Sequence, residues 1–232
     1  MCGRFNITSD PLTVLLMELV GLPHPGPDNF DAAPTETIVV LRLDESGAPE
    51  LVPMRWWITP HWSKGPTSKY AMFNAKSETA ATSPAFRDPF RKRRCVVPVS
   101  GFYEWTRLNN QKVPYLLKAH EDPGLLLAGL WDRWRNPETD ERLESFTVLT
   151  VPAAPAMEQI HRRQPLMLSV ADARDWMDPE NGEFQNLISS ALPVEIDAVP
   201  VSTYVNNARN KDDRCMDPIG KPILLDDGGA PL

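Results

Sequence analysis

Proline recurs so often in this chain that long uninterrupted helices and strands are disfavoured. The 232 residues include 24 prolines, about twice the share found in average proteins. Each proline lacks a backbone N–H and has a fixed φ, so it breaks helix interiors and is excluded from the middle of a sheet. We therefore predict many loops and short strands, with few long helices.

Apolar, β-branched runs between turn residues predict strands, and periodic apolar positions predict helices. Strands are expected at 37–43, 51–58, 95–99, 102–105, 113–119, 125–131, 146–151, 199–202 and 222–225. Helical segments are expected at 11–20, as short pieces within 77–90, and at 154–160, 171–177 and 184–192. Since strands and helices do not alternate regularly, this order favours a single compact α+β domain with antiparallel sheets over a parallel α/β fold.

The two ends of the chain carry boundary signals. Asp10 has the character of an N-cap and Pro11 that of a first helical residue, ahead of leucines that share one helical face. These leucines are Leu12, Leu15, Leu16 and Leu19. Residues 226–232 have the composition of a frayed terminus, so we expect one domain over 1–225 and a flexible tail over 226–232.

The composition is that of an ordinary globular protein, and the use of cysteine indicates a reducing compartment. Hydrophobic residues make up 42% and charged residues 24%, and no apolar run approaches the roughly 20 residues that a membrane span needs. Three widely spaced cysteines, Cys2, Cys95 and Cys215, do not suggest a disulfide framework. We expect a cytoplasmic protein without membrane contact. No Cys or His spacing predicts a metal or another cofactor.

Charge gives a mixed signal about nucleic acid. The net charge of −7 argues weakly against it, because phosphate binding relies on Lys and Arg. The distribution of charge matters more than its sum, and one dense basic run follows Arg87 at 91–94. Such a run is about as often a solvated helix face as a functional surface.

Cys2 directly follows the initiator methionine, which gives it chemistry that an internal cysteine lacks. Methionine is normally removed before a residue this small, and removal leaves an amine and a thiol on adjacent carbons. Such a 1,2-aminothiol captures aldehydes: the amine forms an imine, and the thiol closes a thiazolidine ring. An α-amine has an ordinary pKa of about 7.7–8.0 and is partly neutral near pH 7. The alternative is a small, inert, buried residue on a first strand.

Aldehyde capture needs groups that move protons, and two residues have suitable surroundings. Glu104 follows Phe102 and Tyr103, and on a strand it shares a face with Phe102. A carboxylate in such an apolar setting can relay protons, although a structural role fits the same pattern. His161, beside a proline-bounded turn, is the best placed of the four histidines, with a surface role as the alternative.

Asn74 and Trp62 complete the candidates. The amide of Asn74 can donate to an oxyanion or an imine-derived group, or it can cap a helix that begins near Ser77. Trp62 follows Pro60 in an expected loop, where an exposed tryptophan beside basic residues offers a stacking platform for unpaired bases. A reactive Cys2 should lie open in a groove near these side chains.

The order of several short motifs resembles one known family. They are Met1-Cys2-Gly3-Arg4-Phe5, Asp31-Ala32-Ala33-Pro34-Thr35, Trp57-Ile58-Thr59-Pro60-His61-Trp62, Asn74-Ala75-Lys76-Ser77-Glu78-Thr79, Arg93-Arg94-Cys95-Val96-Val97-Pro98, Gly101-Phe102-Tyr103-Glu104-Trp105, Ala128-Gly129-Leu130-Trp131, Ile160-His161-Arg162-Arg163-Gln164-Pro165, Val201-Ser202 and Val205-Asn206. Across nearly the whole chain, this series is similar to the SOS-response-associated peptidase (SRAP) family of abasic-site-processing proteins.

The resemblance implies a single SRAP-like α+β domain with a barrel-like core, peripheral helices and a basic cleft for single-stranded DNA. It implies autocatalytic removal of Met1 and capture of the abasic sugar by Cys2 as a thiazolidine. Asn74 matches the family's orienting amide, Glu104 its acid–base carboxylate, and His161 the histidine that assists proton transfer. The DNA-binding candidates are Arg4, Trp62, Lys76, Arg87 and Arg162. We expect a monomer without cofactor that associates with the nucleoid when DNA is damaged.

Three positions depart from the family pattern. Lys76 stands where arginine is usual and loses the bidentate fork. The residues after His161 are Arg162-Arg163-Gln164 in place of Asp-Arg-Met, so a base replaces an acid beside the histidine. Trp57 replaces a glycine, which is expected to change the local backbone or the cleft wall.

Two other functions remain compatible with the residues alone. Class-II glutamine amidotransferases also begin Met-Cys-Gly and use the thiol on an amide. They need an early Asn-Gly oxyanion segment, whereas Asn74 precedes alanine here. A non-covalent single-strand binder is the third hypothesis, and its salt-sensitive affinity would not depend on Cys2.

Overall fold

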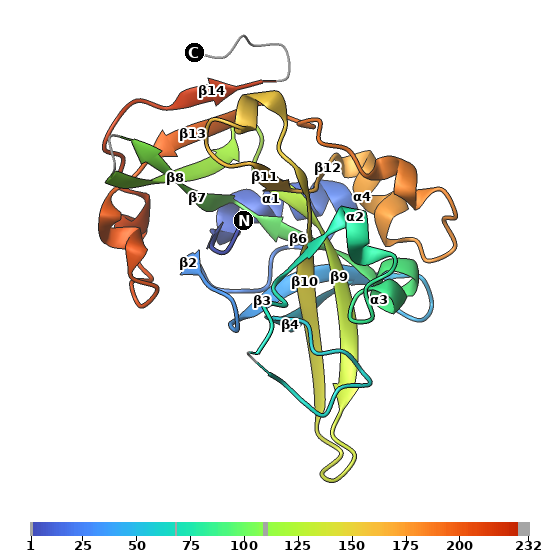
Figure 1. The fold of residues 1–232 in the computed structure, drawn as a ribbon. Helices are drawn as coiled ribbons and strands as arrows, with labels where there is room; N and C mark the ends of the chain where they lie inside the picture. The colour runs from blue at the N-terminus through green and yellow to red at the C-terminus, as the bar shows by residue number, and fades with distance from the viewer. Residues whose placement is uncertain (1, 68, 109–110, 227–232) are drawn as a thin grey trace.

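A computed structural model describes residues 2–67, 69–108 and 111–226 of the chain. Its centre is a β-barrel, in which five strands pair in the order β10, β4, β3, β6, β9 and close when β9 pairs with β10 (Figure 1). These strands are β3 (Thr37–Leu43), β4 (Pro49–Trp56), β6 (Arg94–Val99), β9 (Leu125–Arg135) and β10 (Arg142–Pro152). Short strands continue the barrel wall, namely β5 (Asn74–Lys76), β11 (Arg163–Pro165) and β12 (Met167–Leu168).

A second sheet of six strands lies beside the barrel, in the order β14, β13, β8, β7, β1, β2. Its strands are β1 (Phe5–Ile7), β2 (Asn29–Ala32), β7 (Gly101–Leu108), β8 (Gln111–Ala119), β13 (Ile196–Pro200) and β14 (Ile223–Leu225). All its pairings are antiparallel. The barrel has the same preference except that β10 runs parallel to β4 and β5. The mixed sheet-and-helix fold therefore confirms the predicted α+β class and barrel-like core.

Helices cover the outside of these sheets. The α-helices are α1 (Ser9–Val20), α2 (Ser77–Ala80), α3 (Arg87–Lys92) and α4 (Val170–Met177). Single 3₁₀ turns occur at η1 (Pro155–Met157), η2 (Phe184–Leu187), η3 (Thr203–Asn206) and η4 (Asp213–Met216). Within the described ranges, none of the helices has the length and apolar character needed to cross a membrane.

The predicted leucine face of α1 is confirmed, but the predicted N-cap is wrong. Leu12, Leu16 and Leu19 are fully buried, yet the helix begins at Ser9, so Asp10 lies inside its first turn. The preceding residue, Thr8, is held by Ser100, which accepts hydrogen bonds from the Thr8 backbone N–H at 2.8 Å and from its Oγ1 at 2.7 Å. A contact with a distant strand end therefore sets where this helix starts.

Two other predicted helices shorten to single turns. The segment 154–160 forms only Pro155–Met157, and 184–192 forms only Phe184–Leu187. In both cases buried side chains, such as Met157 and Phe184, pack into the core without a continuous apolar face to extend a helix. The last sheet strands lie at Ile196–Pro200 and Ile223–Leu225, so the first begins three residues earlier than predicted. The tail expected at 226–232 falls, apart from Asp226, outside the described residues.

Strand β7 separates two apolar clusters. Phe102 belongs to the main core between the sheet and the barrel, whereas Tyr103 belongs to a smaller cluster on the outer face of the sheet with Val205 and Cys215. The predicted alternation along this strand is therefore confirmed. Glu104 shares the inner face with Phe102, and only 4% of it is exposed. A carboxyl group is thus placed within the protein interior.

Candidate functional site

The N-terminal segment forms part of the second sheet. Phe5 pairs with Phe102 of β7 on one side and with Ala32 of β2 on the other. The backbone N–H of Tyr103 donates to the carbonyl of Arg4 at 3.0 Å, which carries the pairing one residue toward the N-terminus. Figure 1 shows the start of the chain beside β7 at the centre of the fold. Cys2 is therefore held near Glu104 by strand register rather than by a flexible arm.

An aromatic stack supports this segment from the barrel side. The Phe5 ring lies parallel to the Trp56 ring, with centroids 3.9 Å apart and an interplanar angle of 11°. The indole N–H of Trp56 donates to the carbonyl of Phe73 at 2.9 Å. Because Phe73 precedes Asn74, one buried tryptophan positions both the strand that leads to Cys2 and the strand that carries Asn74.

Asn74 contacts the N-terminal residue directly. Its side-chain Nδ2 donates a hydrogen bond of 2.7 Å to the backbone carbonyl of Cys2. The alternative role as a helix cap is wrong, because the N-cap of α2 is Lys76 and no side-chain cap bond occurs there. Asn74 lies on β5, where it pairs with Val148 of β10. An amide donor is thus aimed at the peptide group that joins Cys2 to Gly3.

The Cys2 side chain is fully buried, so the expectation of a sulfur lying open in a groove is wrong. The side chain belongs to the main apolar core between the sheet and the barrel. Burial raises the pKa of the thiol well above its ordinary value, and the charge of Glu104 raises it further. Cys2 and Glu104 therefore interact electrostatically, and the thiol is protonated near neutral pH.

His161 lies at the end of the loop that leads into β11. Its Nδ1 contacts the backbone carbonyl of Arg163 at 2.9 Å and the backbone N–H of the same residue at 3.0 Å, which orients the ring. Arg163 in turn donates to Thr150 of β10 and forms an ion pair with Glu78 at 2.6 Å. Thr150 pairs with Lys76 of β5. His161 is thus linked to the Asn74 strand through this network, while Asn74 bonds to the Cys2 carbonyl and the charge of Glu104 acts on the Cys2 thiol.

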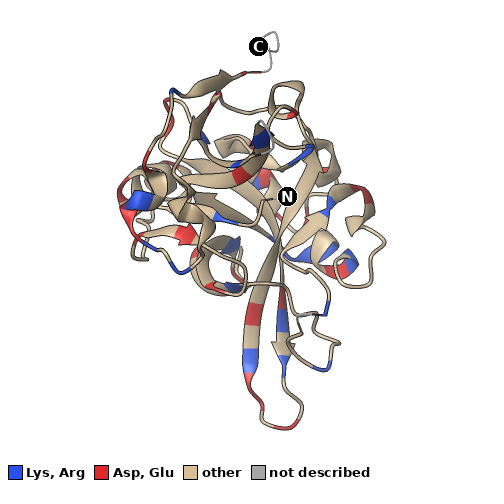
Figure 2. Cartoon of the chain, turned by 60° about the vertical axis from the view of Figure 1, so that its left-hand side comes forward, with Lys and Arg blue, Asp and Glu red and all other residues tan. Residues whose placement is uncertain are grey.

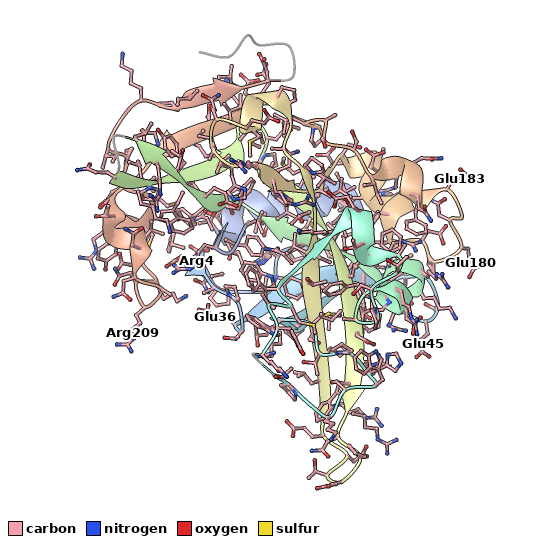
Figure 3. The ribbon with its side chains drawn as sticks, in the orientation of Figure 1. Arg4, Glu36, Glu45, Glu180, Glu183 and Arg209 are labelled. Atoms are coloured by element: carbon pink, nitrogen blue, oxygen red, sulfur yellow. The ribbon has the colours of Figure 1, made fainter. Side chains whose placement is uncertain are left out.

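The five predicted DNA contacts differ in how they are held. Trp62 is 58% exposed, as predicted for a loop. Lys76, Arg87 and Arg162 are also exposed. Arg4 is instead anchored: its NH1 contacts both carboxylate oxygens of Asp31, at 2.7 and 2.6 Å, and its guanidinium lies 5.9 Å from the centroid of the Trp105 ring. Figure 3 shows Arg4 on the same side of the molecule as Glu36 and Arg209.

Asp31 provides a test of this anchored pair. Burial raises the pKa of Asp31 from 3.8 to about 6, although hydrogen bonds and charge from Arg4 oppose the shift. The folded chain therefore binds this proton more tightly than the unfolded chain does. The free energy of unfolding is expected to fall as the pH rises from about 4 to about 6, a slope that Asp31→Asn removes. Urea denaturation at stepped pH measures it, and equal slopes in the two proteins would contradict the assignment.

Two of the three departures from the family pattern have local packing or hydrogen-bond partners, and the third, Lys76, is exposed. Trp57 packs against Phe73, with ring centroids 5.4 Å apart, and its backbone has no positive φ that would require glycine. Gln164 is buried and bonds to the backbone of Ala154 and Ser190. The tryptophan therefore forms a wall beside the Asn74 strand, and the glutamine connects loops.

Several interactions of the site had no signal in the sequence. Asp31 as the partner of Arg4 and Glu78 as the partner of Arg163 bridge 27 and 85 residues, respectively. Spacing rules cover neighbours within an element, so these pairs emerge only from the fold.

Among the described residues, no group of three or more His, Cys, Asp or Glu side chains is arranged to hold a metal ion. In Figure 2 the blue Lys and Arg positions and the red Asp and Glu positions are interspersed along the ribbon, so the acidic residues are not gathered on one element.

The fold and site define a class of protein in which a barrel and a second sheet enclose an N-terminal cysteine beside a buried carboxylate. The chain belongs to the SOS response associated peptidase (SRAP) family, whose family model matches residues 1–208.

The curated relatives are named abasic site processing proteins, and the solved structures share the fold. The chain is 32% identical over 220 residues to the abasic site processing protein YoqW of Bacillus subtilis (strain 168), covering 90% of this chain and 96% of that protein. It is 35% identical over 189 residues to the abasic site processing protein HMCES of Xenopus tropicalis, covering 72% and 56%, respectively. A crystal structure of a phage-related protein from Bordetella bronchiseptica has a TM-score of 0.69 at 26% identity, covering 86% and 94%. One of a protein from Bacteroides thetaiotaomicron reaches 0.77 at 20% identity, covering 94% and 100%, and supports the fold alone.

Proposed function

We propose that this protein recognises abasic sites in single-stranded DNA and captures them covalently through Cys2. The observation that carries the proposal is the fixing of the Cys2 peptide by Asn74, at 2.7 Å, within electrostatic reach of the buried Glu104. Family membership and the names of the relatives, which process abasic sites, agree with it. The protein would act as a cytoplasmic monomer at damaged nucleoid DNA.

The first step is hydrolysis of the Met1–Cys2 peptide bond, which consumes one water and converts the Cys2 nitrogen from an amide to an amine. In this step the protein acts as a peptidase on itself. Glu104 is the base that accepts a proton from the attacking water, since it is the carboxylate whose charge reaches the Cys2 side chain. Asn74 holds the carbonyl on the other side of Cys2 and so keeps the residue in place.

Capture then follows from the two groups of Cys2. The amine adds to C1′ of the ring-opened abasic sugar, and loss of one water leaves an imine. The sulfur attacks the same carbon, the S–H proton passes to nitrogen, and a thiazolidine ring closes. The raised pKa of the thiol means that its proton needs a nearby acceptor. Glu104 supplies that relay, and holding the three reacting groups together supplies much of the rate. His161 would assist proton transfer at the sugar.

The test is a crosslinking reaction with untagged protein and an oligonucleotide that contains one abasic site. We expect a band that survives denaturation, with the mass of the protein lacking Met1 plus the DNA, less one water. An abasic site reduced to the alcohol has no aldehyde and should give no band. A variant with a retained N-terminal extension that still forms the band would refute the mechanism. Ammonia release from glutamine without any adduct would favour an amidohydrolase instead.

Glu104→Gln is expected to slow adduct formation by about 10²- to 10⁴-fold, because an amide cannot relay protons. The side chain is buried and nearly isosteric with glutamine, so the fold should persist. Single-turnover crosslinking at saturating DNA measures the rate, and binding anisotropy serves as the control. A rate within twofold of the parent would remove Glu104 from the mechanism.

A further inference from the structure

The segment between β4 and β5 carries the exposed Trp62 and lies beside the β9–β10 hairpin, where these two strands extend beyond the rest of the barrel (Figure 1). The segment is closed at its base, because the backbone N–H of Ile58 donates to the carbonyl of Met72 at 3.2 Å. Its described residues form no helix or strand. A loop of this length keeps one conformation only when other elements hold it.

Two buried residues that pair across β9 and β10 hold the loop just before Trp62. Asp132 is 2% exposed, Ser145 is fully buried, and the two are register partners. The Ser145 Oγ accepts from the backbone N–H of Thr59 at 2.8 Å, and the Asp132 Oδ2 accepts from the backbone N–H of His61 at 2.9 Å. The same Asp132 oxygen lies 3.0 Å from Nδ1 of the His61 imidazole. His61 is therefore fixed through both its backbone and its side chain.

The loop is held again just after Trp62. Trp134, also on β9, donates its indole N–H to the carbonyl of Ser63 at 2.9 Å. Its ring lies 3.5 Å from the position that a Cβ on Gly65 would take, and Gly65 has a φ of +147°, which favours glycine. The indole N–H of Trp62 itself donates to the carbonyl of Pro84 at 3.2 Å. The backbone on both sides of Trp62 and its ring are thus fixed, while 58% of the residue stays exposed.

A fixed aromatic ring binds a base at lower cost than a mobile ring does. Ordering one side chain on binding lowers the affinity by about two- to twelvefold. Stacking needs only the open face of the ring, and it tolerates any base. Asp132, Ser145 and Trp134 are all buried, so they can affect a bound strand only through the loop. Their hydrogen bonds to the loop remove the ordering cost before DNA arrives.

We propose that Asp132, Ser145 and Trp134 are positioning residues that preorganise Trp62 as a stacking platform for an unpaired base near the abasic nucleotide. The inference rests on the proposed function, because it takes the strand that carries the lesion as the ligand of Trp62. The three residues set how tightly the strand is held, and they leave bond formation at Cys2 unchanged. The β9–β10 hairpin thereby contributes to substrate binding without contacting the substrate.

Asp132→Ala, Ser145→Ala and Trp134→Phe each remove hydrogen bonds to the loop, and the last two keep most of the packing, so they decide the test even if Asp132→Ala does not fold. Thr147→Val is the matched control. It also removes one buried hydroxyl from β10, and that hydroxyl has no hydrogen-bond partner among the described residues. Trp62→Ala removes the platform itself. Affinity is measured by anisotropy on single strands that contain tetrahydrofuran, an abasic analogue without an aldehyde, so no crosslink forms.

Three measurements are expected to separate positioning from chemistry. Trp62→Ala should weaken binding by about fivefold or more, and the positioning variants should weaken it by about two- to twelvefold. The base analogue 2-aminopurine, moved through the positions that flank the lesion, reports stacking: the parent should quench its fluorescence near the lesion, and the positioning variants should quench it less. With a reactive abasic site, the crosslinking rate at saturating DNA should stay within about twofold of the parent, while the DNA concentration for half-maximal rate rises.

Thr147→Val should match the parent in all three measurements. Affinity and quenching equal to the parent in Ser145→Ala and Trp134→Phe would overturn the proposal, as would an equal loss in Thr147→Val. A fall in the saturated rate with unchanged affinity would also overturn it, because the residues would then act on the chemistry. Failure of the parent to crosslink a reactive abasic site would refute the proposed function, whereas binding and quenching with the analogue still decide the positioning role.

Discussion

Cys2→Ala is expected to abolish the denaturation-resistant DNA adduct completely. Alanine is as readily exposed by methionine removal as cysteine is, so the variant keeps an α-amine that can form an imine with the abasic aldehyde. It has no sulfur to close the ring, and the imine reverts by hydrolysis. Denaturing gels of overnight reactions measure the product. The variant should give a band only when a borohydride is present to reduce the imine.

The other cysteines provide a matched control for this variant. Cys95 and Cys215 are also buried, but their nitrogens are held in amide bonds, so neither can form a thiazolidine. Cys215→Ala should therefore crosslink at the rate of the parent protein. A stable band from Cys2→Ala without reductant, or its loss in Cys215→Ala with the fold intact, would contradict a mechanism centred on the N-terminal sulfur.

Trp56→Ala should lower the free energy of unfolding by about 3–5 kcal/mol, the cost typical of truncating a large buried aromatic side chain. Trp56 is fully buried, lies against Phe5 and is near-parallel to Phe146, with centroids 3.9 and 6.3 Å away. The substitution leaves a cavity and removes the hydrogen bond to Phe73. Urea denaturation followed by circular dichroism measures the loss.

Trp57 is the control for this experiment, because it is the same type of residue at a less buried position. Trp57 is only partly buried and has one aromatic contact, with Phe73. Trp57→Ala should therefore cost about 1 kcal/mol. Crosslinking rates should follow the same order, because Trp56 supports the segment that holds Cys2. Equal destabilisation by the two substitutions would show that the Phe5 stack does not stabilise the fold as inferred.

Local pattern predicted most elements but not how they assemble. The run at 37–43 became β3 with the same bounds, and the leucines of α1 face the core, because side-chain periodicity is a local property. Closure of the barrel depends on the pairing of β9 with β10 and of β10 with β4. The second of these joins residues about 90 positions apart in the sequence, which no short window can contain.

The site was predicted partly by chemistry and partly by resemblance. The thiol and amine of Cys2 follow from its position in the chain, and strand alternation placed Glu104 on the inner face of β7. Asn74 was ambiguous from its surroundings alone, and only the bond to the Cys2 carbonyl separates it from a helix cap. The basic run at 91–94 contains both buried and exposed residues. Arg94 is 2% exposed and donates to the carbonyls of Trp176 and Phe90, whereas Lys92 is exposed to solvent.

Strand β1 has a mechanical consequence for any molecule joined to Cys2. It has hydrogen-bonded neighbours on both sides, β2 and β7, and its first residue stacks on the barrel. A pulling force on a polymer joined to Cys2 would act on the β1–β2 and β1–β7 hydrogen bonds at the same time, because the segment is not a free end. A load on such a molecule would therefore be carried by paired strands of the folded domain, and it would fall on the Cys2 segment alone only after β1 separates from β2 and β7.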